Sequence, residues 1–279
     1  MKKYIKEKPI IICCLLFVIC LWVRSIEYFV IRTDETVIGE NLIHKVFGLI
    51  LLFAVLRAAN IKWSEIGFGK QGMLKNTLRG LLLSIICFSV SYGMEIILLT
   101  TQGKAVHMEL YISGFSLTGI AVKNTGALFF LLCIVFNFIN VWMEEGLFRG
   151  FFIKVISDKY SFPKANVGAA LLFGVWHFVM PIRSFFGGEL EFGQMLLMAA
   201  GYIVLSGLMS IKWGLLYKMT GTLWLGTADH FFNNTVAANM LHVVTSGGAD
   251  EMQIVRIMLA QVISFTFVVV IYLLNKREL

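Results

Sequence analysis

Six residues suited to acid–base and hydrogen-bonding chemistry lie in three apolar stretches of this sequence. The stretches cover residues 136–152, 166–181 and 222–240, and the six residues are Glu144, Glu145, Arg149, His177, His230 and Asn234. A charge within an apolar segment is costly unless it has a partner or a function. A carboxylate and an imidazole can take a proton from water as the water attacks a carbonyl group. These residue types are therefore suited to hydrolysis.

Helical spacing groups these residues further. Positions three, four and seven apart share one face of a helix, so Asn137, Asn140 and Glu144 are predicted to form one polar stripe. Glu145 and Arg149 are four apart, which brings a carboxylate within reach of a guanidinium. We expect this stripe to face protein or water, because lipid offers these side chains no hydrogen bonds.

The depths of three ionisable groups also agree. With a rise of about 1.5 Å per residue, His177 is predicted to lie about 16 Å from the membrane surface where its helix enters. The same rise places His230 about 14 Å deep and Glu144 roughly 12–15 Å deep, measured from the same side. Residues from three helices are therefore expected at one level.

One assignment of roles follows from this grouping. Glu144, with His177, is predicted to activate water, while His230 and Asn234 donate hydrogen bonds to the oxyanion of the tetrahedral intermediate. The sequence places no serine or cysteine in an obvious nucleophile setting. The predicted nucleophile is therefore water.

The neighbouring charges are given supporting roles. Glu145 and Arg149 are expected to hold the local helix, and the guanidinium helps to keep Glu144 ionised. Asp229 is next to His230 in sequence but points about 100° away on an α-helix, and it is left out of the site. Glu95, Lys123 and His242 are interpreted as interfacial or snorkelling residues near the opposite surface.

A zinc site is the chemical alternative. Two histidines and one glutamate are also the ligand set of a hydrolytic zinc site. The sequence contains no HExxH motif, and Glu145, the candidate base for such a site, is expected on a different side of its helix from Glu144. The residues alone leave this alternative open.

Composition identifies the elements that must position these groups. The chain has 279 residues, of which 58% are hydrophobic, and a mean hydropathy of +0.80. An ordinary soluble domain is less apolar. We predict an all-α polytopic membrane protein of about eight spans, since apolar runs long enough to cross a bilayer can be found. The runs lie near 9–31, 42–58, 80–99, 126–149, 166–181, 192–217, 221–243 and 254–274.

The charge distribution predicts an orientation. If both termini are cytoplasmic, most of the 24 Lys and Arg residues lie in the cytoplasmic loops and helix ends. This is the distribution that the positive-inside rule requires. The net charge of +7 therefore indicates topology, and no basic cluster with aromatic residues suggests nucleic-acid binding. The five cysteines fall in apolar runs without metal-ligand spacing and are interpreted as packing residues. The polar segment 63–80 is either a surface helix or a plain loop.

Three motifs carry a resemblance to a known family. EEGLFR (144–149) fits EExxxR, FGVWH (173–177) fits FxxxH, and HFFNN (230–234) fits HxxxN. In this order they resemble the CAAX protease and bacteriocin-processing (CPBP, or Abi) family over about residues 125–245. The predicted eight-span layout is similar to that of its Ras-converting CAAX endopeptidase.

The resemblance implies both an architecture and an activity. It implies a single transmembrane domain over 1–279, with the catalytic core at 125–245 and a conical cavity open to the cytoplasm. The implied activity is that of a metal-free, cofactor-free glutamic intramembrane endopeptidase in the cell membrane. The roles implied for the motif residues are those assigned above.

The substrate and the function class remain open at this level. The substrate would be a peptide or membrane-associated protein, of which a prenylated CAAX terminus is the best understood example. The alternatives are a non-catalytic bacteriocin-immunity or binding protein, a proton-coupled transporter, and a zinc-dependent peptidase. A transporter often contains repeated halves with broken helices, and the sequence gives no sign of them.

Overall fold

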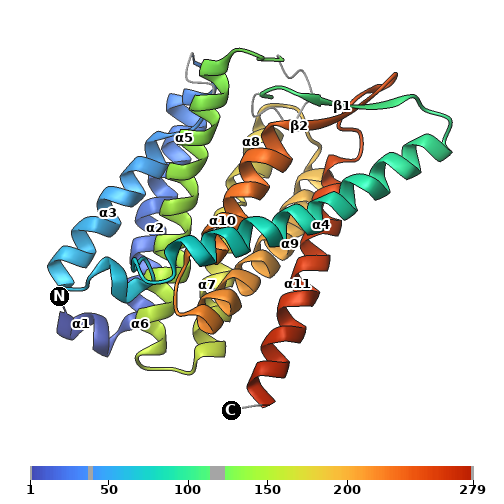
Figure 1. The fold of residues 1–279 in the computed structure, drawn as a ribbon. Coiled ribbons are helices and arrows are strands. Elements are labelled where there is room, and N and C mark those ends of the chain that lie inside the picture. The colour runs from blue at the N-terminus through green and yellow to red at the C-terminus, as the bar shows by residue number, and fades with distance from the viewer. Residues whose placement is uncertain (1, 37–39, 114–122, 278–279) are drawn as a thin grey trace.

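The computed structural model describes residues 2–36, 40–113 and 123–277, and most of these residues are helical (Figure 1). The helices before the motif region are α1 (Lys2–Glu7), α2 (Pro9–Ile26), η1 (Glu27–Ile31), η2 (Thr33–Glu35), α3 (Ile43–Ala59), η3 (Trp63–Ile66) and α4 (Met73–Thr101). The later helices are α5 (Ala127–Glu144), η4 (Glu145–Phe152), α6 (Ile153–Ser157), α7 (Phe162–Trp176), α8 (Val179–Phe186), α9 (Phe192–Thr220), α10 (Trp224–Phe232), η5 (Asn233–Ala237) and α11 (Gln253–Arg277).

Six helical segments among the described residues are long and apolar enough to cross a membrane. They are Pro9–Glu35, Met73–Thr101, Ala127–Ser157, Phe162–Phe186, Phe192–Thr220 and Gln253–Asn275. The protein is therefore an integral membrane protein, as predicted, but the predicted count of eight is not confirmed. The run at 42–58 forms α3, which has 17 residues. The run at 221–243 forms α10 and η5, which end at Ala237 and are followed by a strand.

A small antiparallel sheet departs from the all-helical prediction. Strand β2 (Leu241–Thr245) pairs with β1 (Val106–Leu110) on one side and β3 (Gly248–Ala249) on the other. In Figure 1 the sheet lies over the upper end of the helices, while α1 and the end of α11 lie toward the lower end. Such short strands carry little periodicity of their own, and the pairing of β1 with β2 depends on residues far apart in sequence.

A group of charged residues in and beside the sheet is buried or partly buried. Arg256 donates to Glu95 at 2.6 Å and to Asp250 at 2.9 Å, and His242 Nδ1 lies 2.5 Å from Asp250 Oδ2. The His242 ring also stacks on Tyr111 with 3.8 Å between ring centroids. Glu95 and His242 therefore do not snorkel, because each side chain is buried among protein partners, while their position near the opposite membrane surface stays a prediction.

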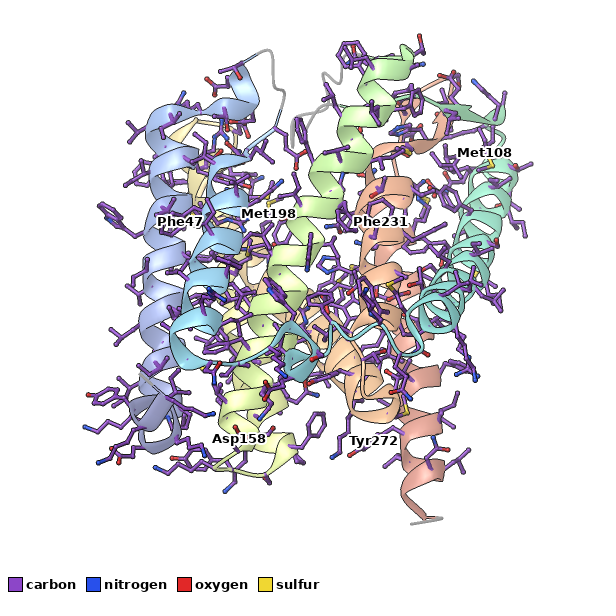
Figure 2. All side chains as sticks on the ribbon, turned by 60° about the vertical axis from the view of Figure 1, so that its left-hand side comes forward. Phe47, Met108, Asp158, Met198, Phe231 and Tyr272 are labelled. Carbon is purple, nitrogen blue, oxygen red and sulfur yellow. The ribbon has the colours of Figure 1, made fainter. Side chains whose placement is uncertain are left out.

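Apolar side chains cover much of the outside of the helices. Figure 2 shows side chains standing out around the bundle, and Leu197, Phe186 and Val30 are each about three-quarters exposed (77%, 75% and 74%). Exposed apolar area on this scale would be unfavourable in water. It agrees with a lipid environment.

Two of the helices that carry the motifs, α7 and α10, approach neighbouring helices closely at glycines. A Cβ atom on Gly80 of α4 would lie 2.3 Å from the backbone oxygen of Leu225 in α10, and one on Gly174 of α7 would lie 2.8 Å from that of Ile203 in α9. Small residues permit such contacts between membrane helices. Helix α10 packs against α4, α5 and α9, so its polar residues face protein.

Candidate active site

Two of the motifs lie where an α-helix changes into a wider π-helix. Helix α5 ends at Glu144 and continues as η4, which contains Glu145 and Arg149. Helix α10 carries His230 and changes at Asn233 into η5, which contains Asn234. Segments of this kind are rare and often occur at functional sites. The side chains of these residues therefore point in directions that differ from those predicted for a uniform α-helix.

The carboxylate of Glu144 is held in the protein interior. The side chain is 3% exposed, its Oε1 accepts a hydrogen bond of 2.9 Å from Trp176 Nε1, and its Oε2 lies 3.5 Å from His230 Nε2. One carboxylate oxygen is thus fixed by the indole at the end of α7. The other faces the imidazole of α10.

The imidazole of His230 lies between two carboxylates. Its Nδ1 is 2.9 Å from Glu145 Oε1, and its Nε2 is 3.3 Å from Asn234 Nδ2. Glu144 and Glu145 were expected on different sides of their helix. Their carboxylates nevertheless both contact the His230 ring. An ionised carboxylate only accepts hydrogen bonds, so Glu145 favours the tautomer with the proton on Nδ1.

The predicted contact between Glu145 and Arg149 is present. Arg149 Nη1 lies 3.5 Å from Glu145 Oε1, and both side chains have 0% exposure. The guanidinium carbon lies 3.8 Å from the ring centroid of Phe173 and 4.6 Å from that of Trp213. Cation–π contacts of this kind are stronger when water is excluded, so the aromatic rings help to hold this buried charge.

His177 lies beside this cluster, across Phe173 from His230. Its Nδ1 is 2.9 Å from the backbone oxygen of Phe173, and its ring centroid is 4.7 Å from that of Phe173. Phe173 also meets His230 edge-on at 6.2 Å. A carbonyl oxygen can only accept, so the Nδ1 proton is committed and Nε2 is left as an acceptor. His177 and Asn234 are only partly buried, unlike Glu144 and His230.

Aromatic residues that the sequence analysis did not single out complete this site. Trp176 donates to Glu144, and Trp213 stacks on His230 with 4.0 Å between ring centroids and an angle of 16°. Trp213 Nε1 in turn donates to Asp229 Oδ2 at 2.8 Å. Asp229 was rightly placed away from His230 on the helix, but it supports that ring through Trp213. No sequence spacing pointed to either tryptophan.

Asp229 belongs to a second buried polar network. It accepts a hydrogen bond of 2.6 Å from Lys212 Nζ and one of 2.6 Å from Ser84 Oγ. Lys212 also donates to Gln261 Oε1 at 2.7 Å and Ser264 Oγ at 2.9 Å. Helices α4, α9, α10 and α11 are joined here, behind the tryptophan that stacks on His230.

The arrangement of Glu144, His177 and His230 can be compared with that of a zinc ligand set. In the described part of the chain, no three His, Cys, Asp or Glu side chains are grouped so that they could hold a metal ion. Glu144 and His230 are close, but His177 is hydrogen-bonded to the backbone of its own helix. The three residues of the alternative ligand set are therefore not gathered around one point in this conformation.

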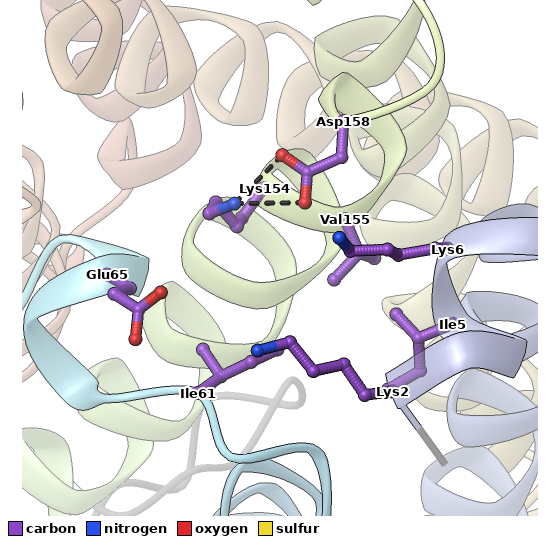
Figure 3. A pocket seen from close by; sticks show the side chains of 8 residues that line it. All are labelled: Lys2, Ile5, Lys6, Ile61, Glu65, Lys154, Val155 and Asp158. Carbon is purple, nitrogen blue, oxygen red and sulfur yellow. Dashed lines mark hydrogen bonds and ion pairs between the residues drawn. The ribbon is translucent and has the colours of Figure 1, made fainter.

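A hollow elsewhere in the molecule is separate from the motif residues. It has a volume of about 450 Å³ and lies between α1, the segment around η3 and α6 (Figure 3). Its lining residues are Lys2, Ile5, Lys6, Ile61, Glu65, Lys154, Val155 and Asp158. Lys154 bonds Asp158 within the hollow at 2.8 Å, and none of the motif residues contributes to its wall.

The fold and the site define a helical membrane protein with a buried glutamate–histidine cluster. Residues 126–236 match the family model described as type II CAAX prenyl endopeptidase Rce1-like, a segment that contains all three motifs. The resemblance to the CAAX protease family is thereby confirmed, and it identifies this segment with a family of membrane peptidases. No curated protein gives a significant match to the chain.

Proposed function

We propose that the protein is a metal-free intramembrane endopeptidase that hydrolyses a peptide bond in a membrane-associated protein or peptide. A CAAX-type prenylated terminus is the first substrate class to test. The observation that carries the proposal is the position of Glu144, whose buried carboxylate is held by Trp176 on one oxygen and faces His230 with the other. A carboxylate fixed in this way is a suitable general base.

The proposed reaction begins with water between Glu144 and His177. Glu144 takes one proton of the water, while His177 Nε2 accepts a hydrogen bond from the other and orients the oxygen. The oxygen attacks the peptide carbonyl, and the resulting oxyanion is stabilised by donors from Asn234 and from His230 when its Nε2 is protonated. Collapse of the intermediate breaks the C–N bond, and the proton on Glu144 passes to the leaving amine.

Glu145 and Arg149 act on this reaction indirectly. The 2.9 Å contact between Glu145 and His230 supports a role for Glu145 in fixing the orientation and tautomer of the ring. Arg149 lies 3.5 Å from Glu145 and partly balances the negative charge of the two neighbouring glutamates. In these roles both residues act through Glu144 and His230 and do not themselves contact substrate.

The proposed setting follows from the charge pattern of the sequence. The excess of Lys and Arg on one set of faces supports cytoplasmic termini in a cell membrane, with a cavity that opens toward that side. His177 and Asn234 are the least buried of the proposed catalytic residues. Substrate and water would therefore approach from their side of the cluster.

Cleavage of a fluorogenic farnesylated CAAX peptide by purified protein tests the proposal. Glu144→Gln and His177→Ala are each expected to lower kcat/KM by about 10²- to 10⁴-fold. Glu95→Gln is the matched control, because Glu95 is as buried as Glu144 but bonds Arg256 in a different network. It should retain activity even if the protein unfolds at a lower temperature.

Adding a strong zinc chelator to the same assay distinguishes the metal-free peptidase from a zinc-dependent one. Activity that is unchanged by chelator and lost in both site variants supports the proposal. Chelator-sensitive cleavage would instead establish a zinc peptidase. If neither prenylated nor unprenylated peptides are cleaved by any form, the peptidase assignment is wrong and a binding or immunity function takes its place.

A further inference from the structure

Arg24 in α2 differs from the other buried basic residues of the described chain. Five Lys or Arg side chains are buried there, and four of them have a carboxylate oxygen within 4.0 Å. These four pairs are Lys45 with Glu40, Arg149 with Glu145, Lys212 with Asp229, and Arg256 with Glu95. Arg24 is 4% exposed and has no such partner among the described residues.

The surroundings of Arg24 leave its donors largely unused. Its one hydrogen bond within the described chain is a long contact of 3.4 Å from Nη2 to the hydroxyl of Tyr28, and its buried Nε has no partner. The guanidinium carbon lies over the rings of Trp176 and Tyr28, at 4.4 and 5.0 Å from their centroids. Aromatic faces stabilise the charge but accept no in-plane hydrogen bond from it.

The acidic residue nearest to Arg24 in sequence is already fully engaged. Glu27 Oε1 accepts from Thr33 Oγ1 at 2.5 Å and from the backbone N–H of Ile43 at 2.7 Å. Its Oε2 contacts the backbone N–H and ring Nδ1 of His44 at 2.7 and 2.5 Å. Outside the described residues, segments 37–39 and 114–122 contain no Asp or Glu, and the remaining acidic groups are Glu278 and the C-terminus, which follow α11. No carboxylate of the described residues lies within 4.0 Å of Arg24, so its donors are available to an anion from outside the protein.

The position of Arg24 relative to Glu144 suggests which anion this is. Trp176 contacts both residues, through the 2.9 Å hydrogen bond to Glu144 and the 4.4 Å contact with Arg24. With the indole between them, the two charges are within about 10 Å of each other, the length of three extended residues. If the reacting bond follows the cysteine of a C-a-a-X terminus, three residues separate the reacting carbonyl from the free α-carboxylate.

We propose that Arg24 binds the C-terminal carboxylate of the substrate and so restricts cleavage to chain ends. This inference rests on the proposed peptidase function. The guanidinium matches a carboxylate with two parallel donors, and binding would place an anion against a buried charge that has no carboxylate within 4.0 Å among the described residues.

The test compares two farnesylated CAAX peptides that differ only in a C-terminal carboxylate or carboxamide. The wild-type protein is expected to cleave the free acid with a kcat/KM about 10- to 100-fold higher, the range for a lost hydrogen bond to a charged group. Arg24→Gln should bring this ratio close to 1, whereas Arg24→Lys should keep part of it. Arg183→Gln is the control, because Arg183 also lies over Tyr28 but is paired with Asp34 and Glu35.

The possible outcomes distinguish a failure of carboxylate binding by Arg24 from a failure of the proposed peptidase function. Equal cleavage of acid and amide by the wild-type protein, or an unchanged preference in Arg24→Gln, overturns the role of Arg24 and leaves the peptidase intact. Cleavage of neither peptide by the wild-type protein overturns both. If Arg24→Gln fails to fold, inhibition of the wild-type protein by the released tripeptide decides, since the acid should inhibit about tenfold more strongly than its amide.

Discussion

His230 Nδ1 lies 2.9 Å from Glu145 Oε1, on the opposite side of the ring from the nitrogen that faces Glu144. Two consecutive glutamates therefore contact the two nitrogens of one imidazole. The contact crosses from the start of η4 to α10, so it connects two motifs that are 85 residues apart. It also sets the tautomer of His230, because an ionised carboxylate can only accept.

Substitution of Glu145 tests this relationship. In Glu145→Gln, the neutral amide accepts more weakly and can also turn its NH₂ group toward the ring, which favours the other tautomer. We expect kcat to fall by about 10- to 100-fold with little change in KM, because the imidazole would be misaligned for the reaction rather than for substrate binding. A kcat within twofold of wild type, in protein that folds normally, would show that Glu145 does not position His230.

Trp176→Phe isolates the hydrogen bond to Glu144. Phenylalanine keeps an aromatic ring but removes the N–H donor, so kcat/KM is expected to fall by about tenfold. Trp142→Phe is a matched control, because the buried Nε1 of Trp142 has no partner among the described residues. It should leave activity unchanged and should not destabilise the protein. Equal losses in the two variants would count against a specific role for Trp176.

Lys212 and Asp229 are expected to matter together more than separately. Lys212→Met leaves the carboxylate of Asp229 buried without its cation and should lower the free energy of unfolding by about 3–5 kcal/mol. The double variant Lys212→Met/Asp229→Leu removes both charges and should recover part of this loss. Denaturant unfolding in detergent measures both effects. The two residues are not coupled if the losses of the single variants Lys212→Met and Asp229→Leu simply add up to the loss of the double variant.

Gly80 is expected to be intolerant of a larger side chain. Gly80→Leu would force α4 away from the backbone of Leu225, and overpacking of this kind typically costs about 1–3 kcal/mol. Gly93 is the control on the same helix, since a Cβ there meets nothing within 4 Å. Thermal unfolding should show a lower midpoint for Gly80→Leu than for Gly93→Leu. Equal midpoints would mean that the helices separate without cost.

Acid stability should depend on Asp250, in the loop between β3 and α11. Burial would raise the pKa of this carboxyl, but hydrogen bonds from His242 and Arg256 lower it below its usual 3.8. A lowered folded-state pKa gives stability that is present above the unfolded pKa and lost as the pH falls below it. Asp250→Asn should therefore be less stable than wild type at neutral pH, and the difference in thermal midpoint should shrink below about pH 4. A constant difference across this range would contradict the prediction.

Local patterns were sufficient to locate the six long apolar helices and the motif residues, although they also predicted two further spans that are not confirmed. Long apolar runs require helices in a bilayer, because lipid supplies no partners for backbone groups. The four-residue spacing of Glu145 and Arg149 likewise predicted a contact that is present at 3.5 Å. These features depend only on composition and on helix periodicity, and both can be read from neighbouring positions in a chain.

The tertiary structure decided what lies between those segments. The shortness of α10, the pairing of β1 with β2 and the two π-helical segments depend on packing between distant parts of the chain. The same is true of Trp176 and Trp213, which look like ordinary apolar residues in sequence but touch Glu144 and His230. By itself the sequence determined which segments are apolar enough for a membrane and which of their residues carry charge. Only the folded chain decided their partners, because a buried charge is stabilised by groups that converge in space and not by their order along the chain.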